Sequence, residues 1–111
     1  MMADAKILQA VVACAELIRG RYVRRPEAVY PQKIRDDFDP ASVGVNHAFA
    51  RHVLYMCDEI PGMLAGIGAL SSDPYREKVM RWLGFVQGYL WAEGYASLPA
   101  LKRMNMPDEE R

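Results

Sequence analysis

The chain has 111 residues, with 14 basic and 14 acidic side chains, and 51% of its residues are hydrophobic. A chain of this length buries roughly two-thirds of its unfolded surface, which is enough for one hydrophobic core and excludes a two-domain organisation. The zero net charge argues against polyanion binding by the whole molecule, and the apolar content excludes an intrinsically disordered chain. We therefore expect residues 1–111 to form one folded domain.

The composition predicts an all-α fold. The chain contains no threonine and only four serines, whereas alanine, leucine and methionine are abundant. These three residues favour helices, and the strand-forming threonine is missing. We expect a small bundle of three long-to-medium helices plus a short C-terminal helix, with a long irregular loop after the first helix.

The first helix is predicted from about Asp4 to Arg19, because its apolar residues recur every three or four positions and Gly20 follows as a stop signal. A long loop is predicted over residues 20–43, where prolines interrupt every periodic pattern. Within this loop, the Gln32–Phe38 segment is expected to form one helical turn. Loops of this length are uncommon in compact domains and are usually functional, mobile or folded onto a partner.

The second helix is predicted to begin after Ser42, which is a good N-cap residue. Pro61 is expected to end or kink this helix, because proline removes an amide donor and crowds the preceding turn. The segment that follows, residues 61–68, contains three glycines and is expected to form at most a short, weak helical turn.

Two further helices have clear start and stop signals. The third is predicted from Pro74 to about Glu93, with Asp73 as its N-cap and Gly94 as its stop. The fourth, from Leu98 to about Met104, is expected to be short and capped by Ser97. The tail, residues 108–111, is expected to fray.

The third helix is apolar on nearly all sides from Trp82 onward, so it must be covered on more than one side, in the bundle or at a subunit interface. Its interior glycines, Gly84 and Gly88, each cost about 1 kcal/mol relative to alanine. They are explained by the close approach of another helix, from this chain or from a second copy, or they make room for neighbouring aromatic side chains in an ordinary core. These interpretations remain open. The candidate interface residues are Trp82, Gly84, Phe85, Gly88, Tyr89 and Trp91.

Two segments of the C-terminal third carry a resemblance. Residues 81–91 read RWLGFVQGYLW and residues 101–107 read LKRMNMP. With these segments, about residues 76–107 resemble a group of small bacteriophage- and prophage-encoded proteins for which no activity is known. The resemblance implies a phage accessory protein that acts in the bacterial cytoplasm by binding a macromolecule, and components of host defence are among such partners. No catalytic or binding residue carries over from the group.

A basic cluster follows the first helix. Residues 1–25 contain five basic and two acidic residues, and an aromatic ring lies among the arginines. Such a patch is typical of nucleic-acid or nucleotide binding. In the other interpretation, the arginines pair with Asp36, Asp37 and Asp39 of the same loop. The candidate anion-binding patch consists of Arg19, Arg21, Tyr22, Arg24 and Arg25.

The sequence predicts no catalytic site, metal site or cofactor. His47 and His52 are five residues apart, so they lie on different faces of a helix. Two metal ligands on one helix would lie on the same face. Cys14 and Cys57 fall on apolar helix faces and are expected to be buried thiols in a reducing cytoplasm. The four serines lie at predicted helix starts or turns, where capping explains them without a catalytic role. No apolar run is long enough to span a membrane.

These observations predict a non-enzymatic, all-α interaction protein that binds a host or phage macromolecule, with a protein as the favoured partner and inhibition of a host defence system among the expected roles. A homodimer is expected as well, because the third helix offers a second apolar side. A small nucleic-acid- or nucleotide-binding module that uses the basic patch is the alternative. A structural component of the virion or of its assembly is a second alternative.

Overall fold

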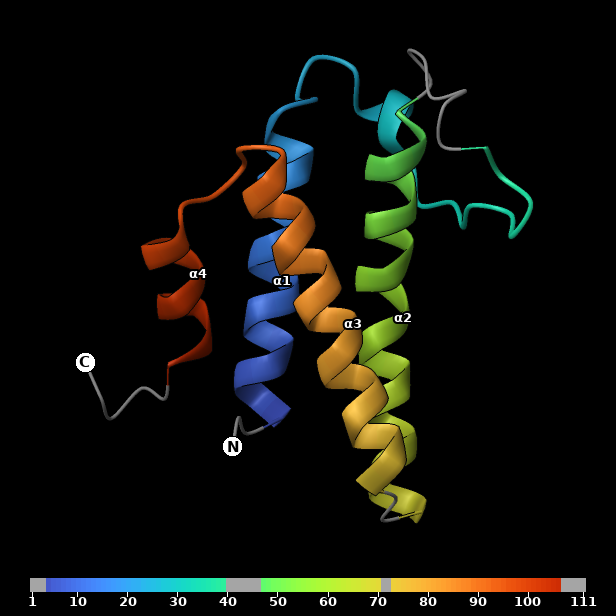
Figure 1. Ribbon diagram of the computed structural model, residues 1–111, viewed down its shortest axis with the longest axis vertical. Helices are drawn as coiled ribbons and strands as arrows, with labels where there is room; N and C mark the ends of the chain where they lie inside the picture. The colour runs from blue at the N-terminus through green and yellow to red at the C-terminus, as the bar shows by residue number, and fades with distance from the viewer. Residues whose placement is uncertain (1–3, 40–46, 71–72, 107–111) are drawn as a thin grey trace.

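The computed structural model describes residues 4–39, 47–70 and 73–106. The described residues form four α-helices and one short 3₁₀ helix, and they contain no strand. The long helices run up, down and up, and the short C-terminal helix runs down again beside the first (Figure 1). The prediction of a small all-α bundle with a short C-terminal helix is confirmed.

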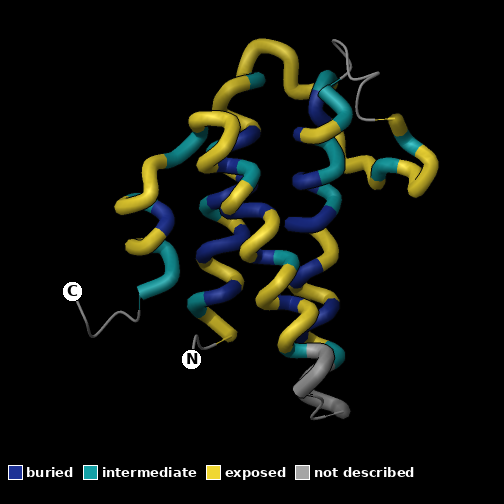
Figure 2. The backbone as a smooth tube through the Cα atoms, viewed as in Figure 1, coloured by how far each residue is buried: buried dark blue, intermediate teal, exposed yellow. Residues whose placement is uncertain are grey.

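Helix α1 spans Asp4–Gly20, as its apolar spacing predicts. Its buried side chains meet those of α2 (Ala48–Leu70) and α3 (Asp73–Ala92) in one continuous core (Figure 2). The largest fully buried side chains of the core are Ile7, Ile18, Leu54, Ile60, Leu83 and Leu90. Because these apolar faces are buried against one another, α2 and α3 lie side by side and both pack against α1.

Helix α2 begins later than predicted. Its first residue is Ala48, and it follows His47, whose φ of 55° lies outside the helical region. The predicted cap, Ser42, lies outside the described residues. The backbone carbonyl of His47 accepts a hydrogen bond from the Arg51 N–H at 3.0 Å, which closes the first turn of the helix.

Helix α2 also runs through Pro61 to Leu70, so the predictions that the helix ends at this proline and that a weak separate turn follows are wrong. Pro61 is exposed, and its missing N–H costs one intrahelical hydrogen bond. Met63 and Leu64, in the next turn, are buried in the core. Burial of these side chains stabilises the helical path beyond the proline, and tertiary packing thereby overrides local propensity.

The ends of α3 and α4 match their signals within one or two residues. Gly94 follows α3 with a φ of 75°, a left-handed conformation that favours glycine. Helix α4 spans Leu98–Asn105, and the Ser97 hydroxyl accepts a hydrogen bond from the Ala100 N–H at 3.2 Å. The buried Gln87 amide exchanges two hydrogen bonds with Asn105, at 2.9 and 3.0 Å, and this pair joins α4 to α3.

The loop after α1 contains a 3₁₀ helix, Pro26–Val29, and then follows the side of α2. The Gln32 N–H donates to the Arg51 carbonyl at 3.0 Å, and the Arg51 guanidinium donates to the Ala28 carbonyl at 2.9 Å. The helical turn predicted for Gln32–Phe38 is reduced to one hydrogen-bonded turn, from the Phe38 N–H to the Arg35 carbonyl. The loop thus brings residues 32–38 beside the first half of α2.

Candidate functional site

Within the monomer, helix α3 is covered on one side, so it is not the central member of the bundle, and coverage of its other side at a subunit interface stays a prediction. Figure 2 shows buried residues along its inner side and exposed residues along its outer side. Phe85 is 58% exposed and Trp91 is 55% exposed, although both are large apolar residues. The fully buried apolar residues of α3 are Val79, Leu83, Val86 and Leu90.

The two glycines of α3 do not serve close packing within the monomer. Gly84 and Gly88 are exposed, and a Cβ atom added at either position would have no neighbour within 4 Å among the described residues. The interpretation that another helix of the same chain approaches them is therefore wrong, because α1 and α2 pack against the opposite face of α3. A contact with a second copy stays a prediction.

The candidate interface residues divide into two surfaces. Trp82, Phe85 and Tyr89 lie on the side of α3 that faces α2, where Trp82 and Tyr89 are partly buried against the core. Gly84 and Trp91 lie on the outer side, and Gly88 lies at the boundary between the two surfaces. The structure therefore does not bring the predicted set together as one patch.

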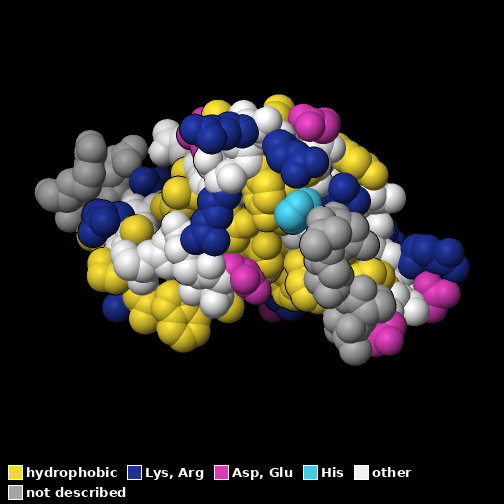
Figure 3. Space-filling model, turned by 90° about the horizontal axis from the view of Figure 1, so that it is seen from above, with side chains coloured by type: hydrophobic (Ala, Val, Ile, Leu, Met, Phe, Trp, Pro, Cys, Tyr) yellow, Lys and Arg dark blue, Asp and Glu magenta, His cyan; other side chains and the backbone are white. Residues whose placement is uncertain are grey.

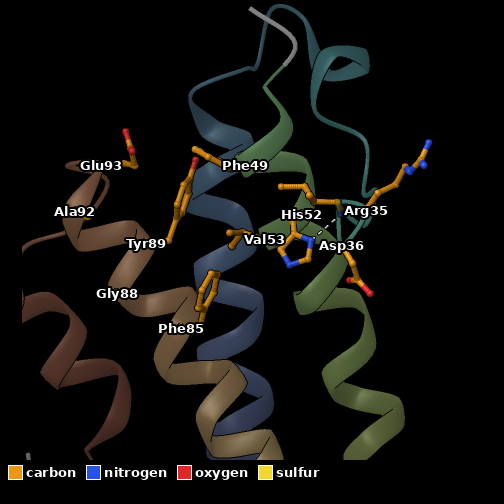
Figure 4. Close-up of a pocket in the computed structure, with 11 residues that line it drawn as sticks. Arg35, Asp36, Phe49, His52, Val53, Phe85, Gly88, Tyr89, Ala92 and Glu93 are labelled. Carbon is orange, nitrogen blue, oxygen red and sulfur yellow. Dashed lines mark hydrogen bonds between the residues drawn. The ribbon is translucent and has the colours of Figure 1, made fainter. Parts of the chain in front are cut away.

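The surface that faces α2 is part of an open cavity of about 700 Å³, which we call the α2–α3 groove. Figure 4 shows its side chains projecting from the two helices toward the space between them. A cavity of this size falls within the range of binding sites in proteins. The groove is lined by Phe49, His52 and Val53 of α2, by Phe85, Gly88, Tyr89 and Ala92 of α3, and by Ile34, Arg35, Asp36 and Glu93.

The loop closes one side of the groove through His52. The Ile34 N–H donates a hydrogen bond to His52 Nδ1 at 3.0 Å, drawn as the dashed line in Figure 4. Since Nδ1 accepts this bond, the neutral ring carries its proton on Nε2. Arg35 projects away from the cavity and pairs with Asp37 at 3.0 Å, where both side chains are exposed. The charged groups therefore lie at the rim of the groove, and its interior is apolar and aromatic.

A second hollow continues the groove toward the other end of α3. It has a volume of about 430 Å³ and shares His52 and Phe85 with the groove. Its wall includes Trp82, whose ring lies 6.3 Å from that of Tyr55 and 5.4 Å from the Lys78 ammonium. The two hollows form a continuous seam between α2 and α3, in which the charged residues Lys33, Glu59 and Lys78 line the second hollow beside its apolar residues.

The His52 hydrogen bond predicts a pH dependence of stability. Burial, and next the charge of Lys33, lower the pKa of His52 below its usual value of about 6.5. A histidine with a lowered pKa in the folded state contributes stability above its unfolded pKa, and this contribution is lost as the pH falls through the folded pKa. We expect the wild type to lose about 1 kcal/mol more unfolding free energy than His52→Gln between pH 7 and pH 5, because protonation removes the Nδ1 acceptor.

Urea denaturation at a series of pH values measures this difference. Glutamine keeps a hydrogen-bond acceptor but does not titrate, so the variant serves as the matched reference. The nearby carboxylates that line the same hollows, Asp36, Glu59 and Glu93, are present in both proteins, so the comparison isolates the contribution of His52. Parallel pH profiles for the wild type and the variant would contradict the role of His52.

Two residues of the predicted basic patch, Arg21 and Tyr22, make contacts within the protein, whereas Arg24 and Arg25 are exposed. Seen from the end of the bundle that carries the patch, Lys and Arg side chains form separate groups around apolar surface (Figure 3). The Tyr22 hydroxyl lies 3.3 Å from His47 Nδ1, so this ring is engaged within the protein. Arg24 and Arg25 are exposed, and no ion pair among the described residues joins them to Asp36 or Asp37. Anion binding by Arg19, Arg24 and Arg25 stays a prediction.

Arg21 connects α1 to the end of α3. Its guanidinium donates to the carbonyls of Glu93 and Gly94, at 3.2 and 2.6 Å. It also lies 3.8 Å from the centre of the Tyr95 ring, a cation–π contact. A cation at the carbonyl end of a helix is electrostatically favourable. Burial, and next the neighbouring Tyr89, raise the pKa of Tyr95 to about 12.

Both cysteines are buried thiols, as predicted. Burial raises the pKa of Cys14 to about 11 and that of Cys57 to about 12, so both thiols are protonated at neutral pH. Among the residues that the structure describes, no three His, Cys, Asp or Glu side chains are grouped so that they could hold a metal ion. No described helix is both long and apolar enough to cross a membrane.

Sequence reasoning missed the α2 and loop walls of the groove. Phe49 belongs to the apolar stripe of α2, yet it is 38% exposed at the groove. Ile34 and Asp36 lie in a loop whose sequence has no periodicity, so their position beside α2 could not be predicted. The one signal in the sequence was the length of the loop, which is typical of functional segments.

Comparisons with protein-family models, with curated proteins and with solved structures find no match for this chain.

Proposed function

We propose that this protein is a non-enzymatic binding protein whose α2–α3 groove receives apolar side chains of a protein partner. The observation that carries the proposal is the exposure of two aromatic rings, Phe49 and Phe85, in a concave surface of about 700 Å³. Exposed aromatic side chains in a pocket are typical anchor points of protein–protein interfaces, where burial supplies most of the binding energy.

The shape of the groove favours a helical segment of the partner. The groove and the second hollow share His52 and Phe85, so they form a seam between two antiparallel helices. An amphipathic helix in such a seam places apolar side chains from successive turns in the two hollows. Arg35, Asp36 and Glu93 at the rim of the groove then face the polar sides of that helix.

The chemistry of the groove supports a binding role and gives no reason to propose catalysis. The described residues that line it include no serine, threonine or cysteine, so none of these residues supplies a usual hydroxyl or thiol nucleophile. His52 is engaged at Nδ1 by the loop backbone. The ordinary role of such a histidine is to hold the loop and to present its Nε2–H to a hydrogen-bond acceptor.

The resemblance to small phage-encoded proteins supports a partner from the bacterial host or the phage. One segment that carries it, residues 81–91, includes Phe85, Gly88 and Tyr89 of the α3 wall of the groove. On this proposal the protein acts in the bacterial cytoplasm, and components of host defence are the first class of partner to test.

The test compares capture of proteins from bacterial lysate by the wild type, by Phe85→Asp and by Val12→Asp, with quantitative mass spectrometry. We expect a protein that is captured by the wild type and by Val12→Asp but is at least about tenfold depleted with Phe85→Asp, because a charge in the groove opposes burial of apolar side chains. Val12 is exposed on α1, outside the groove, so its variant is the matched control for an added charge.

Circular dichroism confirms that each variant is folded before the capture is compared. Capture that is identical for the wild type and Phe85→Asp would exclude the groove as the binding site.

A further inference from the structure

His52 lies where the α2–α3 groove and the second hollow meet, because it lines both of them. Figure 4 shows its ring between the loop and Phe85 of α3, and the centres of these two rings are 6.5 Å apart. The ring centre of Tyr55 is 5.8 Å away. A polar atom of His52 at this point is therefore placed to meet whatever occupies the seam.

The His52 ring has one N–H group whose position is fixed by the loop. A main-chain N–H can only donate, so the bond from Ile34 requires an unprotonated Nδ1, and the proton of the neutral ring is on Nε2. Within the described part of the chain, no hydrogen bond uses this Nε2–H. Fully buried side-chain N and O atoms of the described residues all have partners, so Nε2 is accessible. The seam thus contains an oriented donor that a bound group can use.

The electrostatic surroundings of His52 are positive. Lys33 lines the second hollow, and its charge adds to burial in lowering the pKa of His52. None of the carboxylates that line the two hollows, Asp36, Glu59 and Glu93, counters this shift. Glu59 is seven residues beyond His52 on α2, which is about 10 Å along the helix. The site beside His52 therefore favours a negative group.

Lys33 has its charge available for such a group. It is exposed, and among the described residues no ion pair involves it. The neighbouring Arg35 differs, because it pairs with Asp37 and projects away from the cavity (Figure 4). Lys33 and the Nε2–H of His52 thus form a pair of unused donors beside apolar surface.

We propose that the partner segment in this seam is an acidic amphipathic helix, and that His52 and Lys33 bind the carboxylate of an Asp or Glu side chain between its apolar anchors. A carboxylate has two oxygen atoms, so one accepts from Nε2–H and the other from the Lys33 ammonium. The inference rests on the proposed function and adds the chemistry of the partner.

Other polar groups of a partner helix fit these two donors less well. The backbone carbonyls of a helix are already bonded within it, so the acceptor is a side chain. A hydroxyl or an amide satisfies His52 but gives Lys33 no opposite charge. A basic side chain is opposed by Lys33, and the ring has no acceptor left for it.

The first experiment uses 4-phenylbutyrate as the probe, because it joins a carboxylate to an apolar ring, and 4-phenylbutanamide as its uncharged counterpart. Both are titrated by NMR at about 50 mM salt, where charges are only partly screened. A ligand of this size is expected to bind with a Kd of about 1 mM. We expect the carboxylate to bind about fivefold more tightly than the amide, because its hydrogen bonds are charge-assisted.

Lys33→Gln is expected to remove this preference for the carboxylate. Arg24→Gln is the matched control, since it removes one positive charge from an exposed arginine that lines neither hollow. The amide signal of Ile34 and the indole signal of Trp82 should shift on binding, whereas the indole of Trp91, on the outer side of α3, should not.

Three results of the titration would overturn the proposal. They are equal affinity for the two probes, no binding of the carboxylate up to about 20 mM, well above the expected Kd, and an equal loss of preference in Lys33→Gln and Arg24→Gln.

The second experiment adds Lys33→Glu and Arg24→Glu to the lysate capture. We expect the protein that Phe85→Asp fails to capture to be at least about tenfold depleted with Lys33→Glu as well, and to be retained by Arg24→Glu, because a carboxylate at residue 33 repels that of the partner. Lys33 is exposed in the loop, so the change is not expected to unfold the bundle.

The failure of this inference differs from the failure of the proposed function. Depletion by Phe85→Asp without depletion by Lys33→Glu would leave the groove as the binding site and overturn the acidic partner. Capture that neither variant changes would contradict the proposed function, and the acidic partner with it.

Discussion

Replacing Leu83 with alanine is expected to lower the free energy of unfolding by about 3 kcal/mol. Leu83 is 1% exposed and lies on the buried face of α3, between α1 and α2. Truncation removes its apolar contacts and leaves a cavity that the surrounding helices fill only in part. Urea denaturation of the purified protein, followed by circular dichroism, measures the change.

Phe85→Ala is the matched control, two residues further along the same helix. Because Phe85 is 58% exposed, its truncation is expected to change the unfolding free energy by less than about 1 kcal/mol. The contrast between the two variants tests which side of α3 forms the core. A cost for Phe85→Ala that equals the cost for Leu83→Ala would show that α3 is rotated about its axis, with Phe85 in the core.

Replacing Arg21, which is also exposed, with alanine is expected to cost about 1 kcal/mol of unfolding free energy. The substitution removes two charge-assisted hydrogen bonds, to the carbonyls of Glu93 and Gly94, and the cation–π contact with Tyr95. These contacts join the end of α1 to the end of α3, residues that are more than seventy positions apart in the chain. Thermal unfolding and urea denaturation both measure this decrease in unfolding free energy.

Arg24→Ala is the control for the Arg21 prediction. Arg24 is an exposed arginine of the same segment, and no ion pair among the described residues involves it, so its removal is expected to change stability by less than about 0.5 kcal/mol. Equal effects of the two substitutions would show that general charge near the end of α1, and not the specific contacts of Arg21, stabilises this end of the bundle.

Local signals predicted the features that depend on a few neighbouring residues. Ser97 caps α4 and Gly94 ends α3, because a capping hydroxyl and a left-handed glycine act within one turn of the backbone. Periodicity predicted α1, because the spacing of its apolar residues matches the helical repeat.

The same local signals misplaced the ends of the second helix. Pro61 is a strong local signal for a helix end, yet the burial of Met63 and Leu64 carries α2 beyond it. The rule that proline ends a helix considers only the lost hydrogen bond. The folded protein also gains stability from the packing of the next turn.

The residues of the candidate site were likewise predicted only in part by local signals, and the tertiary structure decided the rest. The unusual apolar content of α3 is enough to indicate Phe85, Tyr89 and Trp91 as candidate interface residues from the sequence. The groove itself also needs Phe49 of α2 and Ile34 of the loop, and no local pattern relates these two residues to α3. The sequence therefore indicated one wall of the site and missed the other two.

The sequence by itself determined the helical class, the α3 and α4 boundaries and the surplus of apolar side chains on α3, because composition, caps and periodicity act over one or two turns. Only the tertiary structure decided which side of α3 is covered. The rotation of a helix that is apolar on nearly all sides is set by the helices that pack against it, and here α1 and α2 cover one face and leave the glycines and Trp91 on the other. The same packing lets Arg21 bind the carbonyl groups at the end of α3, whereas Arg24 and Arg25 stay exposed.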